Sequence, residues 1–221
     1  MKTPLFYRRE HTRGSMITTD LLAFVRAGLP APPARVLEVG AGNGELAQAL
    51  GVAGYDVLAI DPDPRGTEVR RVALLDLDEP DGSFGAALAV TSLHHVEPLE
   101  ESLGRLADLL EPGGVLVVDE FDVGAFDERA AEWWLRQRRA LGGAEDASAE
   151  ELVAEHRAHL HPLERIVAAL EPRFQLTAPV YGPYLYRWDL DESLRPEEEV
   201  AIARGEIPAL GARLLARLAP R

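Results

Sequence analysis

Short apolar runs alternate with amphipathic stretches between residues 34 and 122. The runs are rich in Val, Leu, Ala and Ile, which is typical of buried strands, whereas the stretches between them have helical spacing. This alternation predicts a mostly parallel sheet with helices on both faces. The predicted strands are 36–39, 56–60, 69–75, 86–90 and 115–118, and the predicted helices between them are 45–50 and 99–110.

The connection between the second and third predicted strands is too short for a helix. Only the segment from Pro62 to Val69 separates them. A crossover between parallel strands normally needs roughly a dozen residues or more. We therefore expect a tight loop or a single turn at this place.

Helical patterns continue on both sides of this core. Residues 15–28 predict an N-terminal helix that ends at Gly28. Ser148, with Glu151 three residues later, is a capping box that opens another helix. The predicted helices after the core are 126–141, 149–160 and 162–170.

The last fifty residues predict a hairpin and a helical tail. Two runs, 174–181 and 184–190, have the composition of strands and are joined by the turn dipeptide Gly182-Pro183. They predict an antiparallel hairpin at the edge of the sheet. Residues 195–221 are rich in charge, and we expect a pair of terminal helices broken at Gly205 and Pro208.

The first strand runs directly into a glycine-rich turn and then a helix. Gly40, Gly42 and Gly44 allow backbone conformations, and a close approach to a ligand, that a Cβ atom would prevent. The helix presents free N–H groups to whatever lies over the turn. Glu45 occupies the position of the third glycine of the dinucleotide fingerprint, and a carboxylate there disfavours phosphates. Glu38, just before the turn, favours a ligand with positive charge.

Polar residues follow the other predicted strands where each strand ends. Asp61 lies 21 residues after Gly40, the separation at which an acidic residue accepts both ribose hydroxyls. Asp76 is placed to accept an adenine amino group. The segments 91–95 and 119–121 directly follow the fourth and fifth predicted strands. Ligands of open parallel sheets bind at these carboxyl ends. The pattern predicts one site along this edge.

Four segments together resemble the class I S-adenosylmethionine-dependent methyltransferases that act on small molecules. They read VLEVGAGNGELA (36–47), VLAIDPDP (57–64), LLDLDEPDGSFGAALAVTSLHHV (74–96) and LLEPGGVLVVDEF (109–121). Gly85 departs from the family, which often has Asp there. The resemblance implies a Rossmann-like, doubly wound α/β fold with S-adenosylmethionine as cofactor. The residues assigned to the cofactor are Glu38, Gly40, Ala41, Gly42, Asp61, Pro62, Asp76, Leu77 and Thr91.

The candidate catalytic residues are His94, His95 and Glu120. Either histidine is placed beside the expected methyl position and has a side chain that accepts a proton near neutral pH. In the family this segment also shapes the cofactor pocket, so a pocket-shaping role stays open, as does the choice between the two histidines. Glu120 follows the fifth strand and could face the acceptor or be solvated. No acidic residue ends the fourth strand, so we expect no metal site.

Composition limits the choice of partner. The 221 residues carry a formal net charge of −14, which disfavours a nucleic-acid substrate. No apolar run is long enough for a membrane span, and no signal-peptide pattern opens the sequence. There is no cysteine, which excludes disulfides and zinc–thiolate sites. We expect a cytoplasmic monomer or homodimer that binds no membrane.

The expected function is methyl transfer from S-adenosylmethionine to an O or N nucleophile of a small metabolite by in-line displacement. Two alternatives stay open: a non-catalytic S-adenosylmethionine-binding subunit, and an RNA or protein methyltransferase. We expect one domain over residues 1–221. Its parts are a lid (1–33), a cofactor-binding core (34–122), a helical acceptor-side segment (123–172), an edge hairpin (173–190) and a helical tail (191–221).

Overall fold

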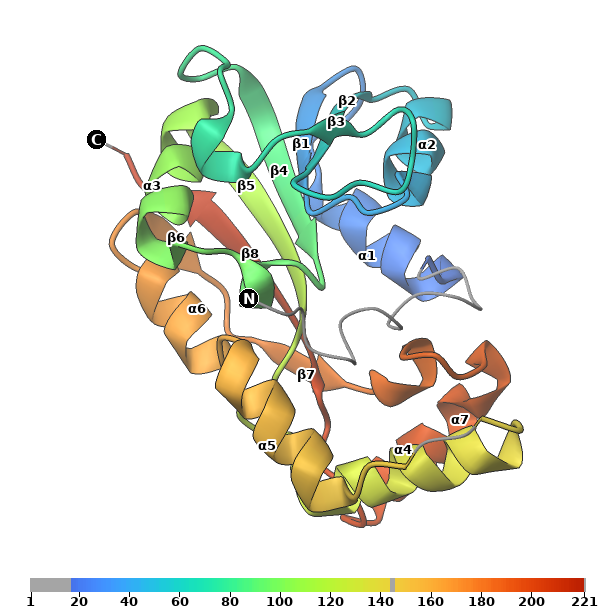
Figure 1. The fold of residues 1–221 in the computed structure, drawn as a ribbon. Coiled ribbons are helices and arrows are strands. Elements are labelled where there is room, and N and C mark those ends of the chain that lie inside the picture. The colour runs from blue at the N-terminus through green and yellow to red at the C-terminus, as the bar shows by residue number, and fades with distance from the viewer. Residues whose placement is uncertain (1–16, 144–145, 221) are drawn as a thin grey trace.

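A single mixed sheet forms the centre of the molecule. The computed structural model describes residues 17–143 and 146–220 (Figure 1). The strand order is β3-β2-β1-β4-β5-β8-β6, and β7 also pairs with β8. The parallel strands are β1 (Arg35–Val39), β2 (Asp56–Asp61), β3 (Arg70–Arg71), β4 (Phe84–Val90) and β5 (Leu110–Phe121). The strand order reverses between β1 and β4, which is where ligands bind in folds of this kind.

Helices cover both faces of the sheet, as the alternating pattern predicts. Helices α1 (Thr19–Gly28) and α2 (Glu45–Val52) pack on one face against Val36 and Val117. Helices α3 (Leu99–Leu109) and α6 (Leu163–Leu170) pack on the other. Alternate residues of each strand point to opposite faces, so β5 contributes Val117 to one core and Val118 to the other.

A third apolar cluster lies beyond the carboxyl ends of the strands. It joins α4 (Glu128–Ala140), α5 (Ala149–His159), the 3₁₀-helix η4 (Leu185–Arg187) and α7 (Arg195–Ala203) (Figure 1). The predicted capping box is present, since Ser148 and Glu151 exchange hydrogen bonds at the start of α5. The segment after the core therefore folds over the sheet edge where the site is predicted.

The predicted third strand is mostly not a strand. Only Arg70–Arg71 pairs with β2, and Leu74–Asp76 form the 3₁₀-helix η2. No helix lies between β2 and β3, so the expectation of a short loop there is confirmed.

The predicted hairpin and helical tail are wrong in their placement. The antiparallel strands are β6 (Phe174–Leu176), β7 (Val180–Gly182) and β8 (Gly211–Leu218), and β8 pairs with β5. Of the predicted tail, α7 is helical but residues 211–218 are a strand. Burial alternates along β8, whose Ala212, Leu214 and Ala216 are buried. Pairing with β5 and this alternate burial outweigh the helix propensity of its Leu, Ala and Arg residues.

Residues 184–190 do not form the second strand of a hairpin because Glu198 binds their backbone. The Glu198 carboxylate is fully buried and accepts hydrogen bonds from the N–H groups of Tyr184, Leu185 and Tyr186 at 2.7–2.9 Å. These are the groups at the start of η4. The side chain from α7 therefore acts as a cap for this short helix.

We expect Glu198→Ala to lower the free energy of unfolding by roughly 3 kcal/mol, because three buried N–H groups lose their acceptor. Urea denaturation measures the change. Glu197→Ala is the matched control, since Glu197 lies on the same helix and is exposed, and its effect should stay within about 0.5 kcal/mol. Equal stabilities of the two variants would contradict the capping role.

Candidate active site

The glycine turn after β1 has the conformation that its sequence predicts. Gly40 and Gly42 have positive φ angles of +73° and +55°. A Cβ atom at Gly40 would collide with the side chain of Ser92, so this position holds β1 close to the end of β4. A Cβ atom at Gly42 would meet nothing within 4 Å, so the space beside the turn is open there. Helix α2 begins at Glu45 directly after the turn.

Asp61 is joined to the glycine turn by hydrogen bonds. Its Oδ2 accepts from the N–H of Gly42 at 3.0 Å, and its Oδ1 accepts from the N–H of Asp63 at 2.8 Å. Pro62 is exposed and begins the loop to β3, where the N–H of Arg65 donates to the Gly42 carbonyl at 2.9 Å. Asp61, Pro62 and the turn residues Gly40, Ala41 and Gly42 are thus brought together, as predicted.

Glu38 places a carboxyl group in the interior, beneath the turn. Its side chain is 4% exposed, and in the described part of the chain its Oε2 has no hydrogen-bond partner. Burial raises the pKa of Glu38 to about 8, and the charge of Asp61 adds to this, while the Ala47 backbone N–H acts in the opposite direction. An unsatisfied buried oxygen favours a partner that forms a hydrogen bond with it.

We expect the stability of the wild type to fall relative to Glu38→Gln as the pH rises from about 5 to about 8, by roughly 1.4 kcal/mol per pH unit. The unfolded chain releases this proton near pH 4.5, whereas the folded protein keeps it until about pH 8. The stabilisation is therefore complete below the lower value and is lost as the pH rises through the higher one. Urea denaturation across this range measures it.

The control for this experiment is Glu68→Gln, which changes an exposed glutamate. Its stability should follow that of the wild type at every pH. Parallel pH dependences of the wild type and Glu38→Gln would mean that Glu38 does not hold a proton in the folded state.

Asp76 and Leu77 lie at the end of η2, which packs against α3. Asp76 is exposed at the end of η2, whereas Leu77 is 2% exposed and packs in the same apolar cluster as Leu74. The backbone of Leu77 accepts a hydrogen bond from Arg105 at 3.0 Å. Their roles at an adenine ring stay predictions.

Thr91 turns the chain away from β4. It has a φ of +49°, which is uncommon for a residue with a β-branched side chain, and its N–H donates to the Asp119 carbonyl at 2.7 Å. The 3₁₀-helix η3 (Leu93–His95) follows at once. The turn therefore places both histidines at the edge of the sheet that also carries the glycine turn.

Glu120 is fully buried, so the alternative that its carboxylate is solvated is wrong, and a direct role at the acceptor stays a prediction. Its Oε1 accepts from the N–H groups of Ser92 and Leu93 at 2.9 and 2.6 Å. Its Oε2 lies 2.5 Å from His94 Nδ1 and accepts from the Phe121 N–H at 3.2 Å. The side chain points into the protein and holds the start of η3.

The contact with Glu120 distinguishes the two histidines. The His94 ring is 4% exposed and is held through Nδ1, and among the described residues no hydrogen bond is made to its Nε2. The His95 ring is partly exposed and lies 4.1 Å from the His94 ring, between centroids. A carboxylate on Nδ1 favours the tautomer whose Nε2 accepts a proton. The geometry therefore favours His94 over His95 as a base.

A buried group of charges at the end of β5 was not predicted from the sequence. Asp119 is 2% exposed and accepts from Arg187 Nη1 at 2.7 Å and from Arg213 Nε at 2.6 Å. Arg213 Nη1 also donates to Asp20 of α1 at 2.6 Å. The one sequence signal was an arginine inside the apolar, aromatic run YLYRW (184–188). Both Asp119 oxygens are engaged with arginines, which leaves this residue unsuited to a magnesium site.

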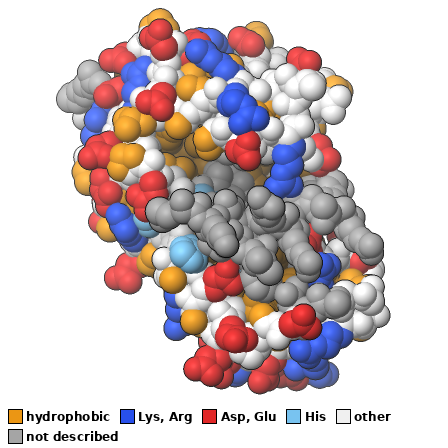
Figure 2. Space-filling view, in the orientation of Figure 1, with side chains coloured by type: hydrophobic (Ala, Val, Ile, Leu, Met, Phe, Trp, Pro, Cys, Tyr) orange, Lys and Arg blue, Asp and Glu red, His pale blue; other side chains and the backbone are white. Residues whose placement is uncertain are grey.

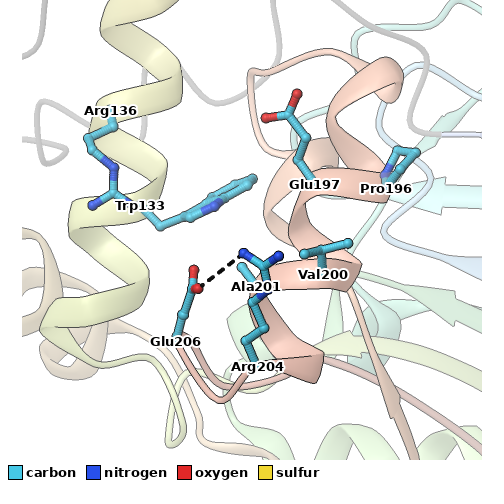
Figure 3. Close-up of a pocket in the computed structure, with 8 residues that line it drawn as sticks. All are labelled: Trp133, Arg136, Pro196, Glu197, Val200, Ala201, Arg204 and Glu206. Carbon is cyan, nitrogen blue, oxygen red and sulfur yellow. Dashed lines mark ion pairs between the residues drawn. The ribbon is translucent and has the colours of Figure 1, made fainter.

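A separate pocket of about 370 Å³ lies between α4 and α7 (Figure 3). Its lining includes Trp133, Arg136 and Val200, with Arg204 and Glu206 3.7 Å apart at its edge. None of its lining residues comes from the carboxyl ends of the parallel strands. The pocket is therefore not part of the candidate active site.

Charge on the face drawn in Figure 2 is mixed, with acidic and basic side chains interspersed over it. Within the residues that the structure describes, no helix is long and apolar enough to cross a membrane. Over the same residues, no group of three or more His, Cys, Asp or Glu side chains has the arrangement of a metal site.

The comparisons with known proteins show the family of this chain. A family model described as "Methyltransferase domain" matches residues 9–159. The uncharacterised methyltransferase Mb0092 of Mycobacterium bovis is 30% identical over 186 residues, which cover 75% of this chain and 92% of that protein. The chain thus belongs to the class I S-adenosylmethionine-dependent methyltransferases.

One further curated relative and one solved structure of similar fold have named reactions. The ubiquinone biosynthesis O-methyltransferase of Xanthomonas campestris is 34% identical over 110 residues, which cover 43% of this chain and 46% of that protein. The Burkholderia thailandensis 1,6-didemethyltoxoflavin-N1-methyltransferase, solved with 1,6-didemethyltoxoflavin and S-adenosylhomocysteine, has a TM-score of 0.55 and 19% identity. That alignment covers 97% of this chain and 81% of the solved one. The chain spans about 40% of the length of the first curated relatives it matches.

Proposed function

We propose that this protein transfers a methyl group from S-adenosylmethionine to an oxygen or nitrogen of a small metabolite, with His94 as the general base. The observation that carries the proposal is the His94–Glu120 contact at the end of β4, next to the glycine turn. A base fixed in orientation beside a cofactor site is what transfer to a hydroxyl or ammonium group requires.

The residues present fit S-adenosylmethionine. Glu38 has a buried oxygen without a partner in the described residues, and Gly42 has open space beside it. In the proposed arrangement Glu38, Gly40, Ala41, Gly42 and Thr91 hold the methionine part. Asp61 and Pro62 hold the ribose, and Asp76 with Leu77 holds the adenine.

The chain has little covalent chemistry to perform. The bound cofactor supplies an activated methyl group on a sulfonium. The protein positions the acceptor atom in line with that group, an effect that supplies up to about 7–11 kcal/mol in favourable cases. His94 Nε2 takes the proton that the acceptor loses, and Glu120 holds the ring while it does so.

The named relatives support an acceptor of this class. One is an O-methyltransferase by name, and the other is an N1-methyltransferase by name that was solved with bound 1,6-didemethyltoxoflavin. The mixed charge on the face in Figure 2 and the net charge of −14 favour a small acceptor over RNA.

Calorimetric titration with S-adenosylmethionine and S-adenosylhomocysteine, and with NAD as the control, tests the cofactor. We expect micromolar binding of the first two and none of NAD. A screen of hydroxylated and amine metabolites for S-adenosylhomocysteine release then tests the reaction. Tight cofactor binding with no turnover on any acceptor would favour the non-catalytic alternative, and binding of NAD alone would contradict the proposal.

A further inference from the structure

Arg187 is a buried arginine in which two of the three guanidinium nitrogens have no hydrogen-bond partner among the described residues. Its side chain is 2% exposed, and Nη1 donates to Asp119 at 2.7 Å. Nε and Nη2 are buried and have no hydrogen-bond partner among the described residues. Burying charged donors without acceptors is unfavourable, and each such group in a native structure needs an explanation.

The two unpaired nitrogens form one edge of the guanidinium group. The N–H bonds of Nε and Nη2 point in parallel from that edge, which matches the two oxygens of a carboxylate. Nη1, on the other side, is already taken by Asp119. Arg187 therefore has a complete bidentate donor pair free for a planar oxyanion.

The position of Arg187 connects it to the candidate active site. Asp119, its partner, lies opposite Val90 in the β4–β5 register and accepts from the N–H of Thr91. The guanidinium carbon lies 5.3 Å from the centroid of the Tyr184 ring. These contacts place Arg187 at the same strand ends as the turn that carries His94.

Aromatic rings join the two residues. The Tyr184 ring stacks on Phe121 with centroids 4.8 Å apart, and the Phe121 ring lies 6.3 Å from the His94 ring. Arg187 and His94 are thus linked through Tyr184 and Phe121. Two buried glutamates hold the 3₁₀-helices that carry them, Glu198 at η4 and Glu120 at η3.

From these contacts we infer that the methyl acceptor carries a carboxylate, which Arg187 binds through Nε and Nη2 while the acceptor's hydroxyl or amine lies toward His94. The inference rests on the proposed function and adds the chemical class of the substrate to it. Binding of the carboxylate would satisfy both unpaired donors. Arg187 and Arg213 both donate to Asp119, so two positive charges face one negative charge at this place. The local charge therefore tolerates an anion, although the net charge of the chain is −14.

Paired probes test this inference. The probes are the three hydroxybenzoates and the corresponding hydroxybenzamides. Each amide differs from its acid in having no negative charge and an NH2 group in place of one carboxylate oxygen. Their affinities are measured by calorimetry on the full chain saturated with S-adenosylhomocysteine. We expect the wild type to bind at least one hydroxybenzoate about tenfold or more tighter than its amide.

The variants separate recognition from folding. Arg187→Met removes the charge, and Arg187→Lys keeps a charge for Asp119 but lacks the parallel donor pair. Both should lose the preference for the acid while their affinity for S-adenosylhomocysteine stays that of the wild type. Arg138→Met is the matched control, because Arg138 also pairs with an aspartate and has an unpaired buried Nε, but lies on α4. It should keep the preference.

Three results would overturn the inference: amides that bind the wild type as tightly as the acids, no binding of any acid, or a preference that survives in the Arg187 variants. If Arg187→Met does not fold, the preference of Arg187→Lys for the acid over the amide tests the inference. Failure of the wild type to bind S-adenosylhomocysteine is a different outcome, since it would contradict the proposed function itself.

Discussion

Asp61→Ala is expected to weaken S-adenosylmethionine binding roughly 100-fold or more. In the proposed arrangement the carboxylate accepts hydrogen bonds from both ribose hydroxyls, and bonds to a charged acceptor contribute about 1.5–3 kcal/mol each. Two such bonds correspond to at least about 3 kcal/mol, or two factors of ten in Kd. The substitution also removes the ties of Asp61 to Gly42 and Asp63, which hold the glycine turn against the following loop.

Calorimetry with S-adenosylmethionine measures this loss. Asp63→Ala is the control, because the Asp63 side chain is 92% exposed and its ion pair with Arg71 lies at the surface. Its affinity should stay within about twofold of the wild type, since exposed ion pairs contribute little. Unchanged binding by Asp61→Ala would exclude the ribose role, whereas a loss in both variants would point to the conformation of the loop and not to Asp61.

The part of the site that could be predicted from the sequence is the part built from local motifs. Gly40 and Gly42 lie in the turn that follows β1, and Asp61 is the last residue of β2, so the order of strand, turn and helix already places them at one edge of a parallel sheet. Their contacts span only about twenty residues, as in the Gly42–Asp61 hydrogen bond. Strand and helix patterns over such short separations can be recognised in a single sequence.

The part that could not be predicted depends on contacts between distant segments. Arg213 meets Asp119 across 94 residues and Asp20 across 193. Nothing in the Leu, Ala and Arg residues of 211–218 distinguishes a strand from a helix until β5 is there to pair with. Whether such a segment forms a strand or a helix depends on its tertiary contacts, because strand propensity reflects the neighbours that a residue packs against.

The direction of Glu120 was open for a related reason. Its position after an apolar run is compatible both with solvent and with the interior. The alternation along β5 puts Glu120 on the same side as Val118, toward α3 and α6, and there the N–H groups of Ser92 and Leu93 need an acceptor. The turn at Thr91 creates that need, and the sequence pattern alone does not reveal it.

We expect His94→Gln to lower kcat by roughly 10²–10⁴-fold while the affinity for S-adenosylhomocysteine stays near that of the wild type, because the variant loses the base but keeps the glycine turn and Asp61. The rate of S-adenosylhomocysteine release, measured with the best acceptor from the metabolite screen, gives kcat and KM. His95→Gln is the matched control. It lies next in the sequence, and the contact of Glu120 is with the ring of His94, so the kcat of His95→Gln should fall by less than about tenfold.

Glu120→Gln tests whether the contact through Nδ1 is what makes His94 effective. An amide accepts at only one end, so its NH2 group faces the two partners of one of the two Glu120 oxygens and disturbs two of the four contacts. We expect kcat to fall with little change in KM, because the acceptor does not touch this buried side chain. Loss of cofactor affinity in His94→Gln would instead assign the histidine to the shape of the cofactor pocket. A larger loss of kcat in His95→Gln than in His94→Gln would move the base to the neighbouring ring.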